Sequence, residues 1–220
     1  MPKRTINWIL NFHGIGESIR PFDPGEEHVW VSESRFLSIL DRVCTIPDIE
    51  ITFDDGNISD VLIALPALLE RGLKASFFIP VGKIGHKGFV DEHQLCELHT
   101  QGMTIGSHGW AHQSWRGMSS SESKHELVDS RHLLESVLGV EVLLAACPFG
   151  AYDRLALKRI RAAGYSCAYT SDRGYSSQGD FLRARNTVIS TDSVDEVFSK
   201  RDRYHFGFLD MVRRVVKKVR

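Results

Sequence analysis

The chain has 220 residues with 27 basic and 28 acidic side chains, so its formal net charge is −1 when histidine is neutral. A length in this range is typical of one domain with a large core, and 42% hydrophobic and 25% charged residues are ordinary for a globular protein. These values exclude a disordered, collagen-like or coiled-coil chain and provide no global basic field to attract nucleic acid. We therefore expect one domain over residues 1–220 and no nucleic-acid partner.

The start of the chain and its cysteines bear on the cellular compartment in which the protein is expected. The early apolar run 8–10 is cut by Asn11, so it predicts neither a signal-peptide core nor a membrane span. The four cysteines are widely spaced: Cys44, Cys96, Cys147 and Cys167. Without a C-x-x-C pair, they favour reduced thiols over a zinc knuckle or a disulfide scaffold. We therefore expect a cytoplasmic protein.

Strand-like and helix-like patterns alternate along the chain. Apolar runs that end in polar or glycine residues predict strands, and amphipathic segments with a polar cap predict helices. In chain order these are strand 6–12, helix 32–43, strand 49–53, helix 57–71, strand 75–81, helix 91–100, strand 103–106, helix 121–138, strand 140–146, helix 153–163, strand 165–170, strand 182–189, helix 192–199 and helix 204–219. This alternation is typical of a parallel sheet covered by helices, and seven strands favour an incomplete barrel over an open sheet.

Residues that can carry chemistry follow several of these strands directly. They are His13, the pair Asp54 and Asp55, His108, the segment 148–150, and Asp172. In a parallel α/β barrel the positions after the strands form one rim, which is where active sites lie. The pattern therefore predicts a single site at that rim.

His108 and His112 have the spacing of a metal-binding pair. At positions i and i+4 on a helical turn, two imidazoles share one face with their Cβ atoms about 5–6 Å apart. A hydrolytic metal site would need a third protein ligand and an open position for water. Taken alone, the spacing fits two surface or capping histidines equally well, because the chain has ten histidines.

The adjacent carboxylates Asp54 and Asp55 make the metal interpretation stronger. At the end of a strand they point to opposite sides of the pleat, so one can bind a metal while the other faces a water. The alternative is a simple turn, because Asp-Gly is a common turn dipeptide. Turn chemistry does not explain two carboxylates together with a histidine pair at the rim of a later strand.

Together these motifs resemble those of the polysaccharide deacetylases, the NodB-homology domain of carbohydrate esterase family 4. Residues 52–56, Thr-Phe-Asp-Asp-Gly, resemble the first family motif. Residues 108–112, His-Gly-Trp-Ala-His, resemble the second, H-[ST]-x-x-H, and residues 148–150, Pro-Phe-Gly, resemble the core of the third. The resemblance covers nearly the whole chain and implies an α/β fold, a distorted (β/α)7 barrel.

The resemblance also implies roles for individual residues. Asp55, His108 and His112 would hold a divalent metal, with zinc as the default and cobalt, nickel or manganese also compatible with the ligands. Asp54 would be the general base that activates water, and the backbone N–H of Phe149 would help to stabilise the oxyanion.

The chain departs from the family pattern at several positions. Gly109 stands where Ser or Thr is usual, and Ala146 stands where the third motif carries an arginine that orients the base. We expect Arg185 to replace that arginine. The Asp-Trp pair of the fourth motif is absent, with Asp172 near its place, and no general-acid histidine ends an apolar strand downstream of Asp172.

His13 is the candidate for that missing acid. It ends the first strand, and in a closed barrel the first strand can occupy the place that the last strand has in other members. This arrangement resembles a circularly permuted branch of the family, which includes deacetylases of exported poly-N-acetylglucosamine. His13 would protonate the leaving amine, with His205 as a second candidate. The alternative is a histidine that caps a glycine-containing loop.

Substrate contacts are expected from Trp110, Pro148 and Asp172, although Trp110 could equally pack beneath the rim instead of stacking on a sugar. Five of the eight residues 213–220 are basic. The pattern favours a solvated last helix, whose cations suit its C-terminal dipole. Peripheral contact with an anionic inner-membrane surface is the alternative.

We therefore expect a metal-dependent carbohydrate N-deacetylase, a hydrolase acting on carbon–nitrogen bonds other than peptide bonds. Its substrate would be an N-acetylated sugar, as a nucleotide-sugar or lipid-linked glycan, in surface polysaccharide or lipopolysaccharide (O-antigen) biosynthesis. Two alternatives stay open: a catalytically impaired carbohydrate-binding domain of the same fold, and a metal amidohydrolase acting on a small cytosolic amide.

Overall fold

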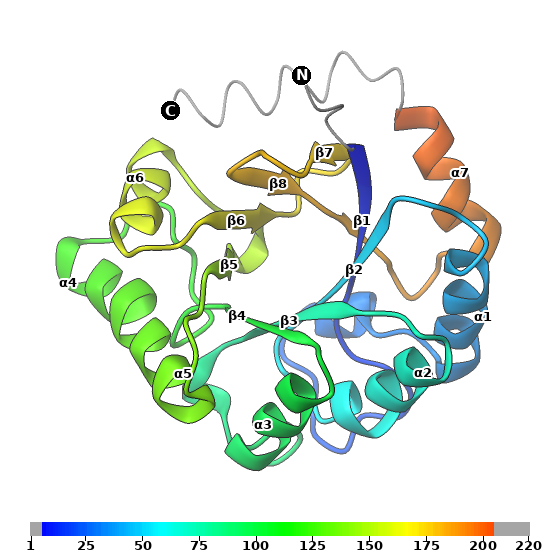
Figure 1. Ribbon diagram of the computed structural model, residues 1–220, viewed down its shortest axis with the longest axis horizontal. Coiled ribbons are helices and arrows are strands. Elements are labelled where there is room, and N and C mark those ends of the chain that lie inside the picture. The colour runs from blue at the N-terminus through cyan, green and yellow to red at the C-terminus, as the bar shows by residue number, and fades with distance from the viewer. Residues whose placement is uncertain (1–5, 205–220) are drawn as a thin grey trace.

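The strands curve into a nearly closed barrel, and the helices pack around its outside (Figure 1). The computed structural model describes residues 6–204. Its strands are β1 (Ile6–Phe12), β2 (Ile49–Asp54), β3 (Ala75–Ile79), β4 (Thr104–Ser107), β5 (Leu144–Ala146), β6 (Cys167–Thr170), β7 (Tyr175–Ser177), β8 (Leu182–Ala184) and β9 (Asn186–Thr187). Their order in the sheet is β7-β1-β2-β3-β4-β5-β6-β8, with β9 also paired to β1. The predicted α/β barrel class is confirmed.

The helices occupy the connections between the strands. The α-helices are α1 (Glu33–Val43), α2 (Leu65–Glu70), α3 (Glu92–Thr100), α4 (Ser120–Ser123), α5 (Ser130–Leu138), α6 (Arg154–Ala162) and α7 (Val194–Tyr204). Short 3-10 turns are η1 (Glu26–Val29), η3 (Val81–Lys83) and η5 (Pro148–Gly150), and π-helical turns are η2 (Asp60–Ala64) and η4 (Lys124–Asp129). Within residues 6–204 no helix has the length and apolarity needed to cross a membrane.

The barrel closes where the chain passes from β8 to β9. Ala184 of β8 pairs with Thr170 of β6, whereas Asn186 of β9 pairs with Leu10 of β1. The single strand predicted over 182–189 is therefore two short strands that join different edges of the sheet. Arg185 lies between them, so this residue occupies the seam of the barrel.

The buried apolar side chains form two separate clusters, and alternate residues of β1 belong to different ones. Trp8, Leu10 and Phe12 belong to the large core between the sheet and the helices, where Phe12 packs edge-on against Phe36 of α1. Ile9, between them on β1, belongs to a second, smaller cluster with Phe78, Ala146, Cys167 and Tyr169. Because successive side chains of a strand point to opposite faces, we assign this second cluster to the barrel interior.

Three predicted helix starts are confirmed by their caps. The side chains of Ser32, Asp91 and Asp153 accept hydrogen bonds from backbone N–H groups in the first turns of α1, α3 and α6. Asn57 is not the cap of a helix over 57–71, because its Oδ1 accepts from Arg20 and the helical turns begin at Asp60.

The predicted elements at the end of the chain are only partly described. Helix α7 (Val194–Tyr204) starts later and ends later than the predicted helix 192–199. The predicted helix 204–219 falls almost wholly outside the described residues, as do the basic segment 213–220 and His205.

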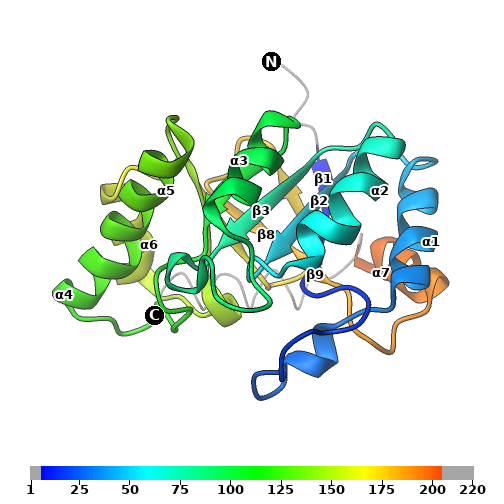
Figure 2. The ribbon, with the colours of Figure 1, turned by 90° about the horizontal axis from the view of Figure 1, so that it is seen from below.

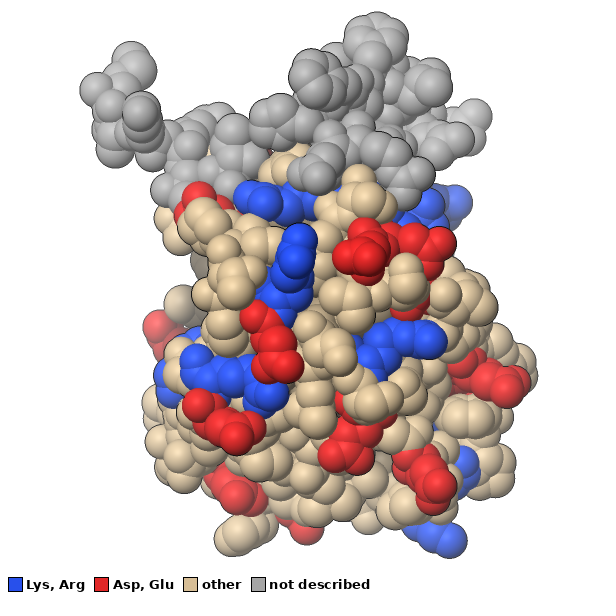
Figure 3. All heavy atoms as spheres, turned by 90° about the vertical axis from the view of Figure 1, so that its right-hand side faces the viewer, with Lys and Arg blue, Asp and Glu red and all other residues tan. Residues whose placement is uncertain are grey.

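Acidic and basic side chains are interspersed over the face that shows the helices at the right of Figure 1 (Figure 3). One ion pair there joins Arg71, which follows α2, to Asp41 of α1 at 2.8 Å between Nε and Oδ1. Such a partly exposed pair is worth only about 0–1 kcal/mol, so the packing of α1 and α2 rests mainly on their apolar faces.

Asp60 is a buried carboxyl group that the fold leaves unsatisfied. It is fully buried at the start of η2, and within the described part of the chain neither carboxyl oxygen has a hydrogen-bond partner. Burial raises the pKa of Asp60 well above its usual value, and the nearby charges of Asp55 and Asp54 raise it further. Asp60 therefore lowers the stability of the folded state when the pH favours its ionisation.

We expect Asp60→Asn to increase the free energy of unfolding at neutral pH by roughly 1–3 kcal/mol, because it removes an ionisable group from an unsatisfied buried position. Above about pH 4 the unfolded carboxyl loses its proton while the folded one retains it, so wild-type stability falls as pH rises. Thermal unfolding between pH 4 and 8 should show the gain of the variant widening with pH. The exposed Asp48→Asn is the control, and a gain that is equal at all pH values would contradict the explanation.

Candidate active site

The carboxyl ends of the parallel strands lie at the lower side of the barrel in Figure 2, where the connection after β1 extends beyond the rim. A cavity of about 640 Å³ opens among these ends. Six residues predicted for the site line it: His13, Asp54, Asp55, His108, His112 and Phe149. The structure thus brings together residues from four different strand–helix connections.

Asp55, His108 and His112 form a cluster suited to a metal. One ligand atom from each lies within 4.8 Å of the others. Nε2 of His112 and Nε2 of His108 lie 3.2 and 3.6 Å from Oδ1 of Asp55. This buried oxygen has no hydrogen-bond partner among the described residues, which is the arrangement expected of a metal ligand. Two imidazoles and one carboxylate fit a divalent metal with an open position for water.

The surroundings of His108 fix the ring for ligation. Nδ1 lies 2.8 Å from the backbone oxygen of Ala146 and donates its proton there, so the lone pair of Nε2 faces Asp55. Burial lowers the pKa of His108 to about 4, although the negative charge of Asp54 opposes the shift. The ring is therefore neutral near pH 7, which is the form that binds metals.

Three residues at the rim have left-handed backbone conformations that side chains rarely adopt. The φ angles are 75° at Asp55, 52° at His112 and 57° at Phe149. Such conformations cost about 1–3 kcal/mol each and cluster at functional sites, where the surrounding structure holds them. At this rim they occur at two of the candidate metal ligands and at the residue expected to bind the oxyanion.

Asp54 is held by a buried polar network inside the barrel. Arg185 donates from Nη1 to Oδ1 and from Nη2 to Oδ2, both at 2.7 Å, and Asn11 donates from Nδ2 to Oδ2 at 3.0 Å. Burial alone would raise the pKa of Asp54, but the Arg185 guanidinium, helped by His108 and His13, holds it far below its usual value. Arg185 thus contacts the predicted base from the seam of the barrel.

His13 lies near Asp54 and lines the same cavity. Its Nε2 is 3.9 Å from Oδ2 of Asp54, and that same oxygen lies 3.8 Å from Nε2 of His108. The His13 ring is partly exposed and lines the cavity, so it is accessible to a substrate bound there. The Asp54–Arg185 pair, in contrast, is buried and fixed in place.

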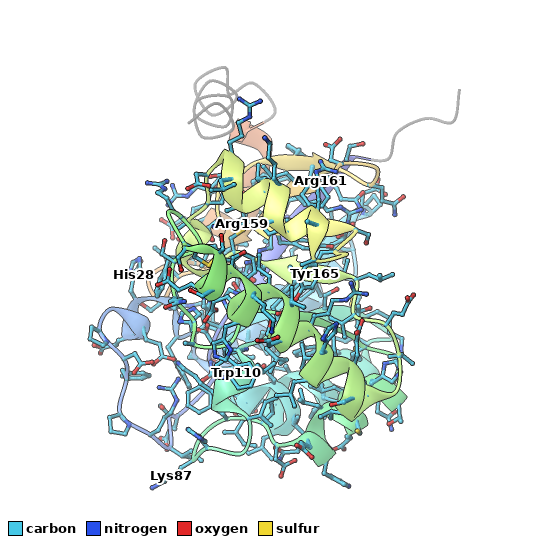
Figure 4. All side chains as sticks on the ribbon, turned by 90° about the vertical axis from the view of Figure 1, so that its left-hand side faces the viewer. His28, Lys87, Trp110, Arg159, Arg161 and Tyr165 are labelled. Carbon is cyan, nitrogen blue, oxygen red and sulfur yellow. The ribbon has the colours of Figure 1, made fainter. Side chains whose placement is uncertain are left out.

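The three predicted substrate contacts are placed differently. Pro148 is buried, and Asp172 accepts hydrogen bonds from Tyr152 at 2.6 Å and from Thr170 at 3.0 Å. Trp110 stacks on His125 at 4.3 Å between ring centroids, beside the helix that carries this histidine (Figure 4). None of the three lines the cavity, and their contact with substrate stays a prediction. Phe149, in contrast, is 71% exposed at the cavity and packs on the ring of His112.

Two parts of the site were not predicted from the sequence. Asn11 could have been identified, because it is a polar residue that interrupts an apolar strand at an inward-facing position. The cavity wall formed by residues 23–29 could not, because no sequence pattern marks it. It is fixed by a buried ion pair of Arg20 with Glu26, by the Arg20–Asn57 hydrogen bond of 2.8 Å, and by Lys83, whose Nζ lies 3.0 Å from Oδ2 of Asp23.

The chain is similar in sequence to known proteins. The sequence profile of the family described as polysaccharide deacetylase matches residues 44–168. YxkH of Bacillus subtilis (strain 168), which carries the name of a polysaccharide deacetylase, is 28% identical over 194 residues, covering 82% of this chain and 70% of YxkH.

Two solved structures share the fold. Streptococcus pyogenes deacetylase PplD in complex with acetate has a TM-score of 0.78 and 20% identity, covering 90% of this chain and 99% of PplD. BC0361, a polysaccharide deacetylase from Bacillus cereus, has a TM-score of 0.79 and 19% identity, covering 90% of this chain and 69% of BC0361.

Proposed function

The chain belongs to the polysaccharide deacetylase family, and from this premise we propose that it is a metal-dependent hydrolase that removes acetyl groups from an N-acetylated sugar. The observation that carries the proposal is the placing of Asp54 beside the cluster of Asp55, His108 and His112 in one cavity. A base next to a metal site is the arrangement that hydrolysis of an amide needs.

The roles of the side chains follow from their positions. A divalent metal, for which we propose zinc, would supply Lewis acidity at Asp55, His108 and His112. Asp54 accepts a proton from the attacking water, and Arg185 with Asn11 keeps its carboxylate oriented. The backbone N–H of Phe149 donates to the negative charge that develops on the acetyl carbonyl oxygen when water attacks the carbonyl carbon, as electrostatic preorganisation requires.

His13 completes the reaction in this proposal. When the carbon–nitrogen bond breaks, the amine nitrogen must gain a proton, and His13 faces the cavity from the side of Asp54. It would donate that proton from Nε2.

We expect His13→Ala to lower kcat on an N-acetylated sugar by about 10²–10⁴-fold while metal content is unchanged. An aryl acetate ester should lose much less activity, because a phenolate leaves without a proton. Steady-state rates on both substrates test the role. Equal losses on the amide and the ester would contradict it.

The contact between Arg185 and Asp54 favours catalysis over the carbohydrate-binding alternative. The case for a catalytically impaired domain depends on two departures from the family pattern: Ala146 stands in place of the arginine of the third motif, and the Asp-Trp pair of the fourth motif is absent. The structure bears on the first of them. Arg185 reaches the base from another strand with two hydrogen bonds of 2.7 Å. A pure binding domain has no need for a buried, oriented base beside a metal site.

Metal content and acetate release on the same preparations test the proposed function. We expect about one equivalent of zinc in the wild type, as a three-ligand site predicts. We also expect acetate release from acetylated oligosaccharides, nucleotide-sugars or both that exceeds release from small amides. His108→Ala should lose metal and activity together, whereas the exposed His93→Ala on α3 should keep both.

A wild-type protein without metal after reconstitution would refute the hydrolase proposal. Preference for small amides over every acetylated sugar would favour the amidohydrolase instead. A cytoplasmic location, peripheral membrane contact and a role in surface polysaccharide or lipopolysaccharide biosynthesis are further proposals that rest on the sequence alone.

A further inference from the structure

The loop between the two candidate histidine ligands is held by a buried glutamate from a distant helix. Glu126 lies in the π-helical turn η4 and is fully buried. Its Oε2 accepts the backbone N–H of Trp110 at 2.9 Å, and its Oε1 accepts the N–H of Ala111 at 3.0 Å. One carboxylate thus fixes two consecutive peptide groups between His108 and His112.

Three further backbone groups of this loop are also hydrogen-bonded. The N–H of Gly109 donates to Oγ of Ser107 at 3.1 Å. On the other side, the carbonyl oxygens of Gly109 and Trp110 accept from the N–H groups of Val81 and Gly82 at 3.0 and 2.9 Å. The loop is therefore clamped between the turn η3 and Glu126, and only Glu126 contributes a charge to the clamp.

The residue type at position 109 fits the presence of Glu126. Gly109 has a φ of +80°, and a Cβ atom built there would lie 2.3 Å from Oε2 of Glu126. The second family motif has Ser or Thr at this position. In this chain the carboxylate of Glu126 occupies the space that such a side chain would enter, so glycine and glutamate are a matched pair.

We infer that Glu126 is a positioning residue for the metal site: through the N–H groups of Trp110 and Ala111 it sets the separation and orientation of His108 and His112. The inference rests on the proposed metal-dependent function for its effect on zinc. Burying a carboxylate is costly unless it accepts hydrogen bonds. The N–H groups of Trp110 and Ala111 supply these bonds, so the loop and the glutamate stabilise each other.

Zinc affinity, measured by competition with a chelator, is the first test. Glu126→Ala should weaken zinc binding about 10–100-fold, the usual effect of removing a group that orients metal ligands. Glu126→Gln keeps the side-chain volume but loses one acceptor, so it should also weaken binding, by a smaller factor. Glu122→Gln, an exposed change in α4, the helical turn directly before η4, is the matched control. A merely structural role would lower Tm and leave zinc affinity unchanged while the protein is folded.

Amide hydrogen exchange on the metal-free protein is the second test, and it does not depend on the proposed function. The amides of Trp110 and Ala111 should lose protection in Glu126→Ala, whereas those of Val81 and Gly82 should keep most of theirs. Unchanged protection at Trp110 and Ala111 would overturn the inference, even if the wild type binds zinc and releases acetate.

A double-mutant cycle tests the matched pair. Gly109→Ser should be more harmful in the wild type than in Glu126→Ala by about 10-fold in zinc affinity, because the 2.3 Å approach to Oε2 exists only when the glutamate is present, whereas the 3.1 Å approach to Nε1 of Trp115 is common to both backgrounds. The strain of a side chain at φ +80° is the same in both backgrounds and cancels. Additive effects of the two substitutions would overturn the pairing of Gly109 with Glu126.

Discussion

Asp54→Asn should reduce kcat on an acetylated sugar by about 10³-fold without loss of metal, because the amide cannot accept a proton from water. Asn preserves the shape of the side chain, so Asp55 and both histidines should keep their positions. Metal content and acetate release on the same sample measure the two parts of the prediction. Retention of more than about a tenth of wild-type kcat would show that another group is the base.

The pH dependence of Asp54→Asn provides a check on the same network. The folded pKa of Asp54 lies far below its usual value because Arg185 overcomes the effect of burial. This carboxylate therefore stabilises the fold above the unfolded pKa of about 4, and that contribution is lost as the pH falls below this value. Wild type and variant should differ most in stability near neutral pH and converge in acid.

Arg185→Met should destabilise the protein by about 3–5 kcal/mol and also impair catalysis, because it leaves the Asp54 carboxylate buried without its cation. Arg185 is fully buried and makes both of its 2.7 Å contacts with Asp54. Urea unfolding and acetate release measure the two effects. If the variant does not fold, Arg185→Lys keeps the charge but not the paired hydrogen bonds and should show the catalytic loss.

A second variant separates the ion pair from general packing. Asp54→Asn combined with Arg185→Met removes both charges and should recover much of the stability lost by Arg185→Met, but none of the activity. Arg183→Met, two residues earlier in β8, removes a pair with Glu50 at 3.1 Å and should cost less. Equal losses for the two arginines, with no recovery in the double variant, would contradict the special role of Arg185.

The parts of the fold that depend on local pattern could be predicted from the sequence. β1 has the predicted bounds, and of the two serines that could cap the helix predicted over 32–43, Ser32 and Ser34, it is Ser32 that caps α1. These elements depend on periodicity and capping within a short window. The rim site was predictable for the same reason, since chemistry-bearing residues come directly after strands.

The parts that depend on contacts far apart in sequence could not be derived from those patterns. The break of the strand 182–189 at Arg185 arises because its two halves pair with different strands. Asn57 is a residue type that commonly caps helices, but its side chain accepts a hydrogen bond from Arg20, thirty-seven positions earlier. The role of Glu126 depends on a contact between a helix and a loop sixteen positions before it. Tertiary contacts override local propensity at all three places.

The seam at Arg185 also sets the order in which a growing chain can complete its fold. The candidate metal ligands are synthesised early, but β1 obtains its partner β9 only after residue 186 has been made. Until residues 175–187 have been made, neither β7 nor β9 covers this edge of β1 and Asp54 lacks its guanidinium, and pairing over such a long separation forms slowly. A chain halted near residue 168 should therefore hold a metal-ligand set beside an uncompensated carboxylate. Asp54 therefore obtains its arginine partner in the same part of folding in which β9 closes the barrel against β1.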